Sequence, residues 1–372
     1  MRPKILIDIN SMIGKKTGVG VFVERLLINL ANTNNYELTA YYFNFLGKKK
    51  VKTTLPNISN VTYKEVKFIP VKVLSALHRI KLQLPVEFLV GFKKYSFLLF
   101  PDFVSLPTVK NTPQAVIIHD LAFLDCPQYV QNANQKYLQT FVKRSVKRAR
   151  FICTISEFTK SRIDYHYKPG KHKPVVVLPI PFYPNLISDS KISAQIKQLA
   201  NSNYLLFVGT LEPRKNVGNL VLAFASISKS LKHKYRLVLA GKDGWDDNKL
   251  KSILRVSEKK AKIETTGYIT DAEKDLLYKN AKVVCLLSHY EGFGMPILEA
   301  SHYNKPVVLS SIAVFRDIAG ENAYYCNQND VQDIIKALES VLKAKKPKLI
   351  TNNYSWEENI STLQVFINKY KL

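Results

Sequence analysis

Short apolar runs alternate with longer amphipathic segments along most of the chain. A continuous apolar run of a few residues is typical of a strand buried on both faces, whereas a helix shows apolar residues every three or four positions. In the first half this pattern predicts strands at 5–8, 115–119, 151–154 and 175–178, and helices at 21–30 and 132–149. Such alternation is typical of doubly wound α/β domains.

The same pattern starts again after a proline-rich segment. Pro179, Pro181 and Pro184 interrupt the chain, as suits a connection between domains. Beyond them the pattern predicts strands at 204–208, 236–240 and 283–287, and helices near 217–231 and 247–259. Thr270 and Glu273 have the spacing of a capping box that would open another helix. We therefore expect two Rossmann-like domains that face each other across a cleft, with a boundary at 183/184.

The segment 283–299 joins a predicted strand to a predicted helix through a glycine turn. Gly292 and Gly294 allow a sharp turn and a close approach to a ligand, and a helix N-terminus offers free N–H groups to a phosphate. Glu291 precedes this helix and Glu299 lies about 7 Å further along it, at 1.5 Å per residue. This geometry suits a nucleotide-sugar. The alternative is that Glu291 and Glu299 are solvated surface charges at a helix end, because most glutamates are exposed.

A second candidate site follows the strand at 204–208. A Gly209-Thr210 turn ends the strand, and Arg214 and Lys215 stand just before the next helix. An arginine fork and a lysine point charge together stabilise a diphosphate. Two cations at a helix start face the positive end of the helix dipole, which disfavours them. A bound anion therefore explains them better than an ordinary surface position at a helix start does. The spacing of a Walker A loop is absent.

The first half contains two weaker candidates. Gly18 and Gly20 follow the first strand and open the first helix, as they would in an ordinary tight turn or in a loop that approaches a ligand. His119 ends a buried strand, at the edge where open α/β sheets bind ligands. A lone histidine is more often structural, held by a carboxylate such as Asp120.

The charge of the chain is strongly positive and unevenly distributed. The 372 residues carry a formal net charge of +26. Residues 1–188 include 28 basic and 10 acidic residues, and residues 189–372 include 27 basic and 19 acidic residues. Basic clusters occur at 48–52, 143–150 and 168–173, and segment 71–82 mixes apolar and basic positions as an interfacial helix would. This charge favours a large anionic partner, either an acidic membrane surface or a nucleic acid. Solvated surface lysines in a lysine-rich proteome are the alternative.

Other features exclude several classes of protein. The apolar start of the chain is interrupted by Asp8 and lacks a cleavage site, so no secretory signal is expected. The best apolar window, 84–100, carries three charged residues and is too short for a transmembrane helix. The four cysteines lie far apart, as expected of reduced cysteines in a cytosolic protein. No Asp-x-Asp and no His/Cys cluster with ligand spacing occurs, so neither a catalytic metal nor another cofactor is expected.

The motif over 291–299 resembles the E-x7-E motif of retaining glycosyltransferases of family four, which have the GT-B fold. The resemblance runs over nearly the whole chain, from the glycine loop near residue 18 to Gly320. It implies that Glu291 contacts the transferred sugar and that Glu299 binds the nucleotide ribose. It also implies that residues 184–352 form the donor domain, that 1–183 form the acceptor side, and that 353–372 include a helix returning to the first domain.

The resemblance assigns roles to further residues. Arg214 and Lys215 would bind the diphosphate, and His119 would contact the sugar and stabilise positive charge at its anomeric carbon. The other donor-binding positions that it implies are Gly18, Gly20, Gly209, Thr210, Tyr268, Ile269, Gly292, Phe293 and Gly294. Val21-Phe22 and Phe315-Arg316-Asp317 depart from the family pattern, which affects the expected donor specificity but not the class of reaction.

The expected protein is thus a retaining, metal-independent glycosyltransferase, similar to mannosyl- and rhamnosyl-type members of bacterial polysaccharide assembly. GDP-mannose is the first expectation for the donor, and a saccharide, most simply a lipid-linked one, for the acceptor. The protein would be cytoplasmic and peripheral at the inner face of the cell membrane. A nucleotide-sugar epimerase or hydrolase with the same fold is the main alternative. A basic nucleic-acid-binding protein is a further one, although no basic-aromatic recognition motif supports it.

Overall fold

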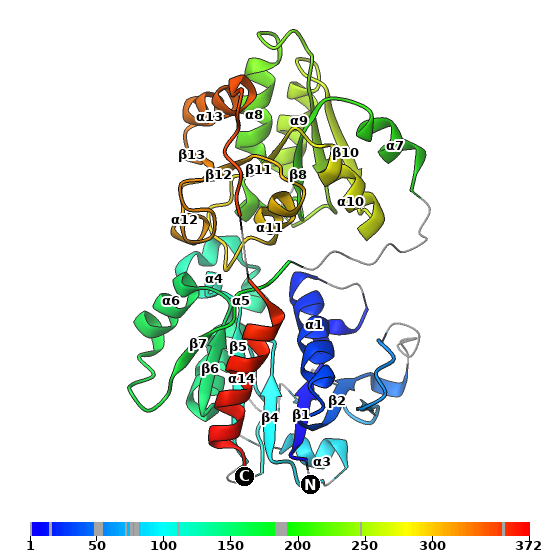
Figure 1. Ribbon diagram of the computed structural model, residues 1–372, viewed down its shortest axis with the longest axis vertical. Helices are drawn as coiled ribbons and strands as arrows, with labels where there is room; N and C mark the ends of the chain where they lie inside the picture. Colours follow the sequence, from blue (N-terminus) through cyan, green and yellow to red (C-terminus); the bar gives the residue numbers. More distant parts are fainter. Residues whose placement is uncertain are drawn as a thin grey trace. The chain divides into compact units, whose positions relative to one another are not determined.

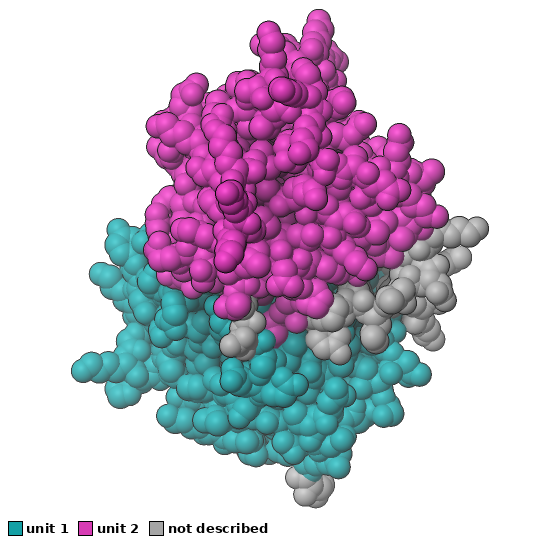
Figure 2. Space-filling model, turned by 45° about the horizontal axis from the view of Figure 1, so that its top comes forward, with its two compact units in different colours: residues 1–180, 354–372 teal, residues 181–353 magenta. Residues whose placement is uncertain are grey.

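The computed structural model describes the chain except for residues 1, 15–16, 48–54, 71–72, 75–76, 78–81, 83, 92, 110–111, 183–191, 246–247 and 352–353. The described residues form two compact units, which Figure 2 shows in different colours. Unit 1 comprises residues 1–180 and 354–372, and unit 2 comprises residues 181–353. The boundaries expected at 183/184 and 352/353 lie outside the described residues, as do the basic run 48–52 and most of segment 71–82.

Unit 1 is built on a seven-stranded parallel sheet (Figure 1). Its order is β3-β2-β1-β4-β5-β6-β7. The strands are β1 (Lys4–Asp8), β2 (Glu37–Phe43), β3 (Val61–Val66), β4 (Phe97–Phe100), β5 (Gln114–Ile118), β6 (Phe151–Thr154) and β7 (Val175–Val177). The helices are α1 (Gly18–Asn32), α3 (Val86–Val90), α4 (Ala122–Asp125), α5 (Asn132–Arg148), α6 (Glu157–Tyr167) and α14 (Trp356–Tyr370), with 3₁₀ turns at 10–12, 45–47 and 127–129. The apolar runs are buried on both faces, which confirms the predicted doubly wound sheet.

The apolar window 84–100 resolves into two short elements instead of one long one. Helix α3 ends at Gly91, which adopts a left-handed backbone with φ 106°, and β4 follows at Phe97. Apolar content alone did not separate them, because a buried helix and a buried strand show the same composition over so few residues. Within the described residues, no helix is long and apolar enough to cross a membrane.

Helix α14, from the end of the chain, belongs to unit 1 and runs alongside α1 (Figure 1). The Trp356 and Phe22 rings lie 5.6 Å apart between centroids. The Asn359 side chain donates to the Pro179 carbonyl, and the Tyr36 hydroxyl donates to Asn368 at 3.4 Å. The last helix therefore packs on the unit that contains the first strand.

Unit 2 contains a six-stranded parallel sheet in the order β10-β9-β8-β11-β12-β13. The strands are β8 (Tyr204–Val208), β9 (Arg236–Ala240), β10 (Ile263–Gly267), β11 (Val283–Leu286), β12 (Val307–Ser310) and β13 (Tyr324–Cys326). The helices are α7 (Ala194–Ala200), α8 (Val217–Ser228), α9 (Asn248–Ser257), α10 (Asp271–Asn280), α11 (Met295–His302), α12 (Ala313–Ala319) and α13 (Val331–Lys343), with a 3₁₀ turn η4 (Pro213–Lys215). The predicted capping box of α10 is confirmed, since Thr270 and Glu273 make both of its hydrogen bonds.

The strand order of unit 2 reverses between β8 and β11. From β8 the chain proceeds outward to β9 and β10, whereas from β11 it proceeds in the other direction to β12 and β13. Val283 of β11 pairs with Leu205 of β8, so the loops that leave these two strands start side by side. In open α/β sheets ligands bind at such a switch point, outside the carboxyl ends of the strands.

Candidate functional site

A cluster of charged side chains lies at the switch point of unit 2. Glu291, in the β11–α11 loop, accepts hydrogen bonds from Arg214 and Lys215 of η4, which follows β8. The Arg214 Nη1 lies 2.9 Å from Glu291 Oε2, and the Ser288 hydroxyl donates to Oε1 at 2.7 Å. The two motifs separated by more than 70 residues in the sequence therefore form one site.

The backbone also joins the two loops. The His289 N–H donates to the Arg214 carbonyl at 2.8 Å, and Arg214 Nη1 donates to the Tyr290 carbonyl at 2.8 Å. The other end of the guanidinium, Nη2, donates to Glu212 Oε1 at 2.8 Å. Arg214 is thus held between two carboxylates and a carbonyl, in the planar fork geometry that favours arginine at such a position.

The carboxyl group of Glu291 is ionised in this environment. It is 8% exposed. Burial opposes ionisation, but the charges of Arg214 and Lys215 and the hydrogen bonds from Lys215 and Ser288 together outweigh it and hold the pKa of Glu291 at about 2. Glu291 is therefore a fixed acceptor for hydrogen-bond donors such as sugar hydroxyls.

Glu299 lies on α11, and a second pair of donors from α10 holds it. Lys274 Nζ lies 2.8 Å from Glu299 Oε1, and the Tyr278 hydroxyl lies 2.6 Å from Oε2. Glu299 is 7% exposed and Tyr278 is fully buried. Sequence reasoning identified Glu299 but missed Lys274 and Tyr278, although the capping box already placed both on a predicted helix.

The turn between Glu291 and α11 requires glycine at position 294. Gly294 has φ 133°, and a Cβ there would lie 2.9 Å from the Phe315 ring and 3.0 Å from Ile297. Phe293 is buried beside it. Gly292 and Gly294 thus connect the charged cluster to the start of α11, as the sequence predicted.

Two glycines lie in close contact at the ends of β8 and β9. Gly241 has φ 155°, and a Cβ on it would lie 1.9 Å from the Gly209 carbonyl oxygen. A Cβ on Gly209 would lie 4.0 Å from Lys215 Cε, so the predicted Gly209-Thr210 turn borders the charged cluster. Tyr268, which follows β10, is 67% exposed, and Ile269 is half-buried.

The remaining candidates belong to unit 1. His119 follows β5 and is buried, and its Nε2 lies 2.8 Å from the Pro101 carbonyl oxygen. The rings of Phe22 and Phe103 pack against it, and burial lowers the pKa of His119 to about 4. The sequence also allowed a structural histidine held by a carboxylate such as Asp120. In the structure the partner of His119 Nε2 is a backbone carbonyl, and Asp120 accepts a hydrogen bond from the Ala122 N–H.

Gly18 and Gly20 form the first turn of α1, which therefore begins three residues earlier than the apolar pattern predicted. A Cβ on Gly18 would meet no atom within 4 Å. The Thr17 side chain, at the N-cap position, accepts no hydrogen bond from the first N–H groups of the helix. The candidate residues of unit 1 are thus a neutral imidazole ring and a helix start that has no side-chain cap from Thr17.

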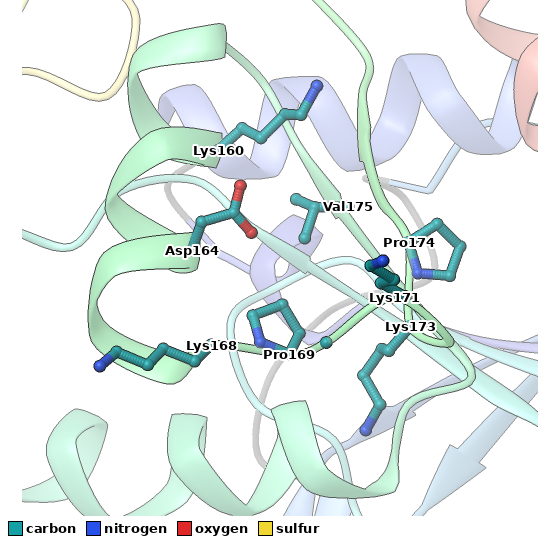
Figure 3. A pocket seen from close by; sticks show the side chains of 9 residues that line it. Lys160, Asp164, Lys168, Pro169, Lys171, Lys173, Pro174 and Val175 are labelled. Carbon is teal, nitrogen blue, oxygen red and sulfur yellow. The ribbon is translucent and has the colours of Figure 1, made fainter.

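The basic loop 168–173 lines a surface hollow of about 480 Å³ beside α6 and the start of β7. Figure 3 shows that the ammonium groups of Lys160, Lys168 and Lys173 point in different directions and not toward one centre. Lys173 donates to the carbonyls of Val146 and Lys147 at the end of α5, and Lys160 pairs with Glu157. The hollow lies at the start of β7, which is the amino end of the parallel sheet, whereas His119 follows β5 at the carboxyl end.

Within the described residues no group of three histidine, cysteine, aspartate or glutamate side chains could hold a metal ion. The four cysteines are buried free thiols. What the site offers is a pair of cations with their acidic partners, at a sheet edge that suits a phosphorylated ligand.

Comparison with known proteins supports this interpretation. Residues 188–356 match the family model of glycosyl transferases group 1. An O-antigen chain mannosyltransferase B from Escherichia coli is 30% identical over 266 residues, which cover 68% of this chain and 69% of that protein. The O-antigen chain mannosyltransferase RfbU from Salmonella typhimurium is 27% identical over 317 residues, covering 85% of this chain and 82% of that protein.

Solved structures show the same fold. A sucrose-phosphate synthase from Thermosynechococcus elongatus superimposes with a TM-score of 0.71 at 14% identity, covering 99% of both chains. The Anabaena protein HepE in complex with UDP-glucose gives a TM-score of 0.63 at 17% identity, covering 99% of this chain and 95% of that one. The likeness confirms the predicted GT-B fold of two Rossmann-like domains.

Proposed function

Because the chain belongs to the glycosyl transferases of group 1, we propose that it is a retaining, metal-independent mannosyltransferase that uses GDP-mannose. The observation that carries the proposal is the Arg214–Glu291–Lys215 cluster at the switch point of unit 2. It combines cations suited to a diphosphate with a carboxylate suited to sugar hydroxyls, on two adjacent loops. The mannosyl donor is supported by the relatives, which are named as O-antigen mannosyltransferases.

In the proposed reaction the bond between the anomeric carbon and the diphosphate oxygen breaks, and the acceptor hydroxyl oxygen bonds to the same face of that carbon. The departing phosphate oxygen takes the proton of the acceptor hydroxyl, so no side chain must form a covalent intermediate. Arg214 and Lys215 would stabilise the negative charge of the leaving diphosphate, which is the role that Mg²⁺ has in metal-dependent transferases.

Glu291 would orient the sugar and not attack it. Both of its oxygens accept hydrogen bonds from neighbouring side chains, which fixes the carboxylate plane and lowers its nucleophilicity. Arg214, Lys215 and Ser288 use three of the roughly four lone-pair positions of a carboxylate, so one position on Oε2 remains to accept from a sugar hydroxyl. His119 would meet the sugar as a neutral ring, because burial holds its pKa at about 4.

The acceptor would be a saccharide, most simply a lipid-linked one, which the protein would meet at the inner face of the cell membrane. Exposed apolar side chains in unit 1 support contact with a membrane: Leu46 is 63% exposed and Phe68 is 66% exposed. The Leu46 N–H donates to the Lys67 carbonyl at 3.0 Å, which holds the two loops side by side next to a lysine. Apolar and basic groups together suit an anionic bilayer surface.

The test of the reaction uses GDP-[¹⁴C]mannose with a lipid extract from a strain that makes a surface polysaccharide. We expect label in the organic phase, an axial linkage that keeps the configuration of the donor, and no turnover when the extract is omitted. Lys215→Ala should lower the rate by more than about tenfold. Lys229→Ala, an exposed lysine at the far end of α8, is the matched control. Equal turnover without acceptor would instead favour a nucleotide-sugar hydrolase or epimerase.

Membrane association is tested by sedimentation with phosphatidylcholine vesicles that contain or lack phosphatidylglycerol. The double change Leu46→Asp and Phe68→Ser should reduce binding to the anionic vesicles. Val365→Ser removes an equally exposed apolar side chain elsewhere in unit 1 and should leave binding unchanged. Equal binding of all three proteins would contradict this part of the proposal.

A further inference from the structure

The carboxylate of Glu299 is held on both oxygens by side chains of a neighbouring helix. Lys274 donates to Oε1 and Tyr278 donates to Oε2. These two residues are one helical turn apart on α10, so they lie on the same face of that helix. The contacts fix the plane of a carboxylate that would otherwise rotate about its last side-chain bond.

Both partners are present in their donor forms. Burial and the nearby charge of Glu299 raise the pKa of Tyr278 well above its ordinary value, so its hydroxyl keeps its proton. Burial lowers the pKa of Lys274, but the charge of Glu299 and its hydrogen bond outweigh that effect, and the pKa is raised. Lys274 therefore stays cationic and Tyr278 stays a hydrogen-bond donor across the physiological range.

An ionised carboxylate has about four lone-pair positions, two on each oxygen. Lys274 and Tyr278 each use one of them, on different oxygens. The arrangement leaves acceptor capacity on both oxygens, which matches two adjacent hydroxyl groups of one ligand. A carboxylate that is already immobilised loses little further freedom when such a diol binds.

We propose that Lys274 and Tyr278 are positioning residues that fix the Glu299 carboxylate for the 2′- and 3′-hydroxyls of a nucleotide ribose. They would thereby make the site selective for ribose over deoxyribose. This inference rests on the proposed function, in which Glu299 binds the ribose of the donor. The competing explanation is that Lys274 and Tyr278 only brace α10 against α11.

The experiment measures the affinity of the full chain for GDP and for 2′-deoxy-GDP by titration calorimetry, with UDP and 2′-deoxy-UDP as the second pair. The wild-type protein should prefer the ribonucleotide by about tenfold or more, because a hydrogen bond to a charged acceptor is lost in the deoxy analogue. Tyr278→Phe and Lys274→Met should each lower that preference to below about threefold, because a mobile carboxylate gains less from each hydroxyl.

Tyr303→Phe is the matched control. The Tyr303 ring stacks on Tyr278 with 6.1 Å between centroids, but its hydroxyl is bonded to Asp275 and not to Glu299. This change should leave the ribose preference at the wild-type level. It also reports any general effect of losing a phenol hydroxyl in the same stacked pair.

The outcomes separate the two levels of the argument. If Tyr278→Phe and Lys274→Met lower the melting temperature yet keep the wild-type ribose preference, the two residues are only a brace and the inference is overturned. If the wild-type protein shows no ribose preference, or binds neither diphosphate, the proposed role of Glu299 fails instead. Loss of the preference in Glu299→Ala together with its retention in both positioning variants would again overturn the inference alone.

Discussion

The change Glu291→Gln tests whether the charged cluster stabilises unit 2. It keeps the shape of the side chain but removes the negative charge that lies between Arg214 and Lys215. The two cations, whose side chains are 19% and 17% exposed, would then lose their shared carboxylate partner. We expect both a less stable unit 2 and a transferase rate that falls by more than about tenfold.

The size of the stability effect follows from the pKa of Glu291, which is about 2 in the folded protein compared with 4.5 for the unperturbed group. That difference corresponds to at most about 3 kcal/mol of the free energy of unfolding. Because the folded pKa is the lower one, this stabilisation is fully present above about pH 4.5 and is lost as the pH falls through about 2. For a unit of this size it corresponds to roughly 6–12 °C in the melting temperature.

The two tryptophans allow the units to be followed separately. Trp245 lies in unit 2 and Trp356 in unit 1, so a Trp356→Phe background reports on unit 2 alone. Urea unfolding of this protein, with and without Glu291→Gln, should show the loss of stability at pH 7 and a smaller difference near pH 3. An unchanged urea midpoint at pH 7 would refute the argument, since it would mean that the carboxylate contributes no net stability.

Three further predictions concern other parts of the molecule. The pKa of His119 is lowered from 6.5 to about 4, so the free energy of unfolding of unit 1 should fall by up to about 3 kcal/mol as the pH falls from about 6.5 through 4. The urea midpoint followed by Trp356 fluorescence measures this loss, and His119→Gln should abolish the pH dependence. Gly241→Ala should lower the free energy of unfolding by about 3 kcal/mol or more, because the new Cβ would lie 1.9 Å from the Gly209 carbonyl oxygen. Gly170→Ala, whose Cβ meets no neighbour, should lower it by about 1 kcal/mol, and thermal melts compare the two. EDTA should leave the transfer rate unchanged, and recovery of a lost rate on adding Mg²⁺ would contradict the proposed metal independence.

The sequence indicated seven of the thirteen strands that the described residues form, but not how the two motifs of the site meet. Strands such as 204–208 and 283–286 appear as short apolar runs, because parallel strands are buried on both faces. Strands β2 and β3 were not predicted, since Glu37–Phe43 and Val61–Val66 mix polar with apolar positions. The contact between Arg214 and Glu291 depends on β8 lying next to β11, and strand order is not encoded in local periodicity.

The same limit applies to the partners of the predicted site residues. Glu299 stood out because it follows a glycine turn at a helix start, which is a local signal. Tyr278 and Lys274 carry no such signal, because a tyrosine and a lysine on an amphipathic helix are ordinary residues until the neighbouring helix is placed. Their importance comes from tertiary contacts to one carboxylate.

The two cations of the cluster differ in how many of their hydrogen-bond donors are used within the protein. Arg214 uses both ends of its guanidinium on the protein, with Nη1 on Tyr290 and Glu291 and Nη2 on Glu212. Lys215 has three ammonium hydrogens and donates one to Glu291. Arg214 is therefore suited to fixing the orientation of Glu291 while its charge still acts on a nearby anion, whereas Lys215 also keeps hydrogen-bond donors for that anion. In the proposed function the arginine fork would hold the acid that orients the sugar, and the lysine on the same short turn would still have donors for the diphosphate.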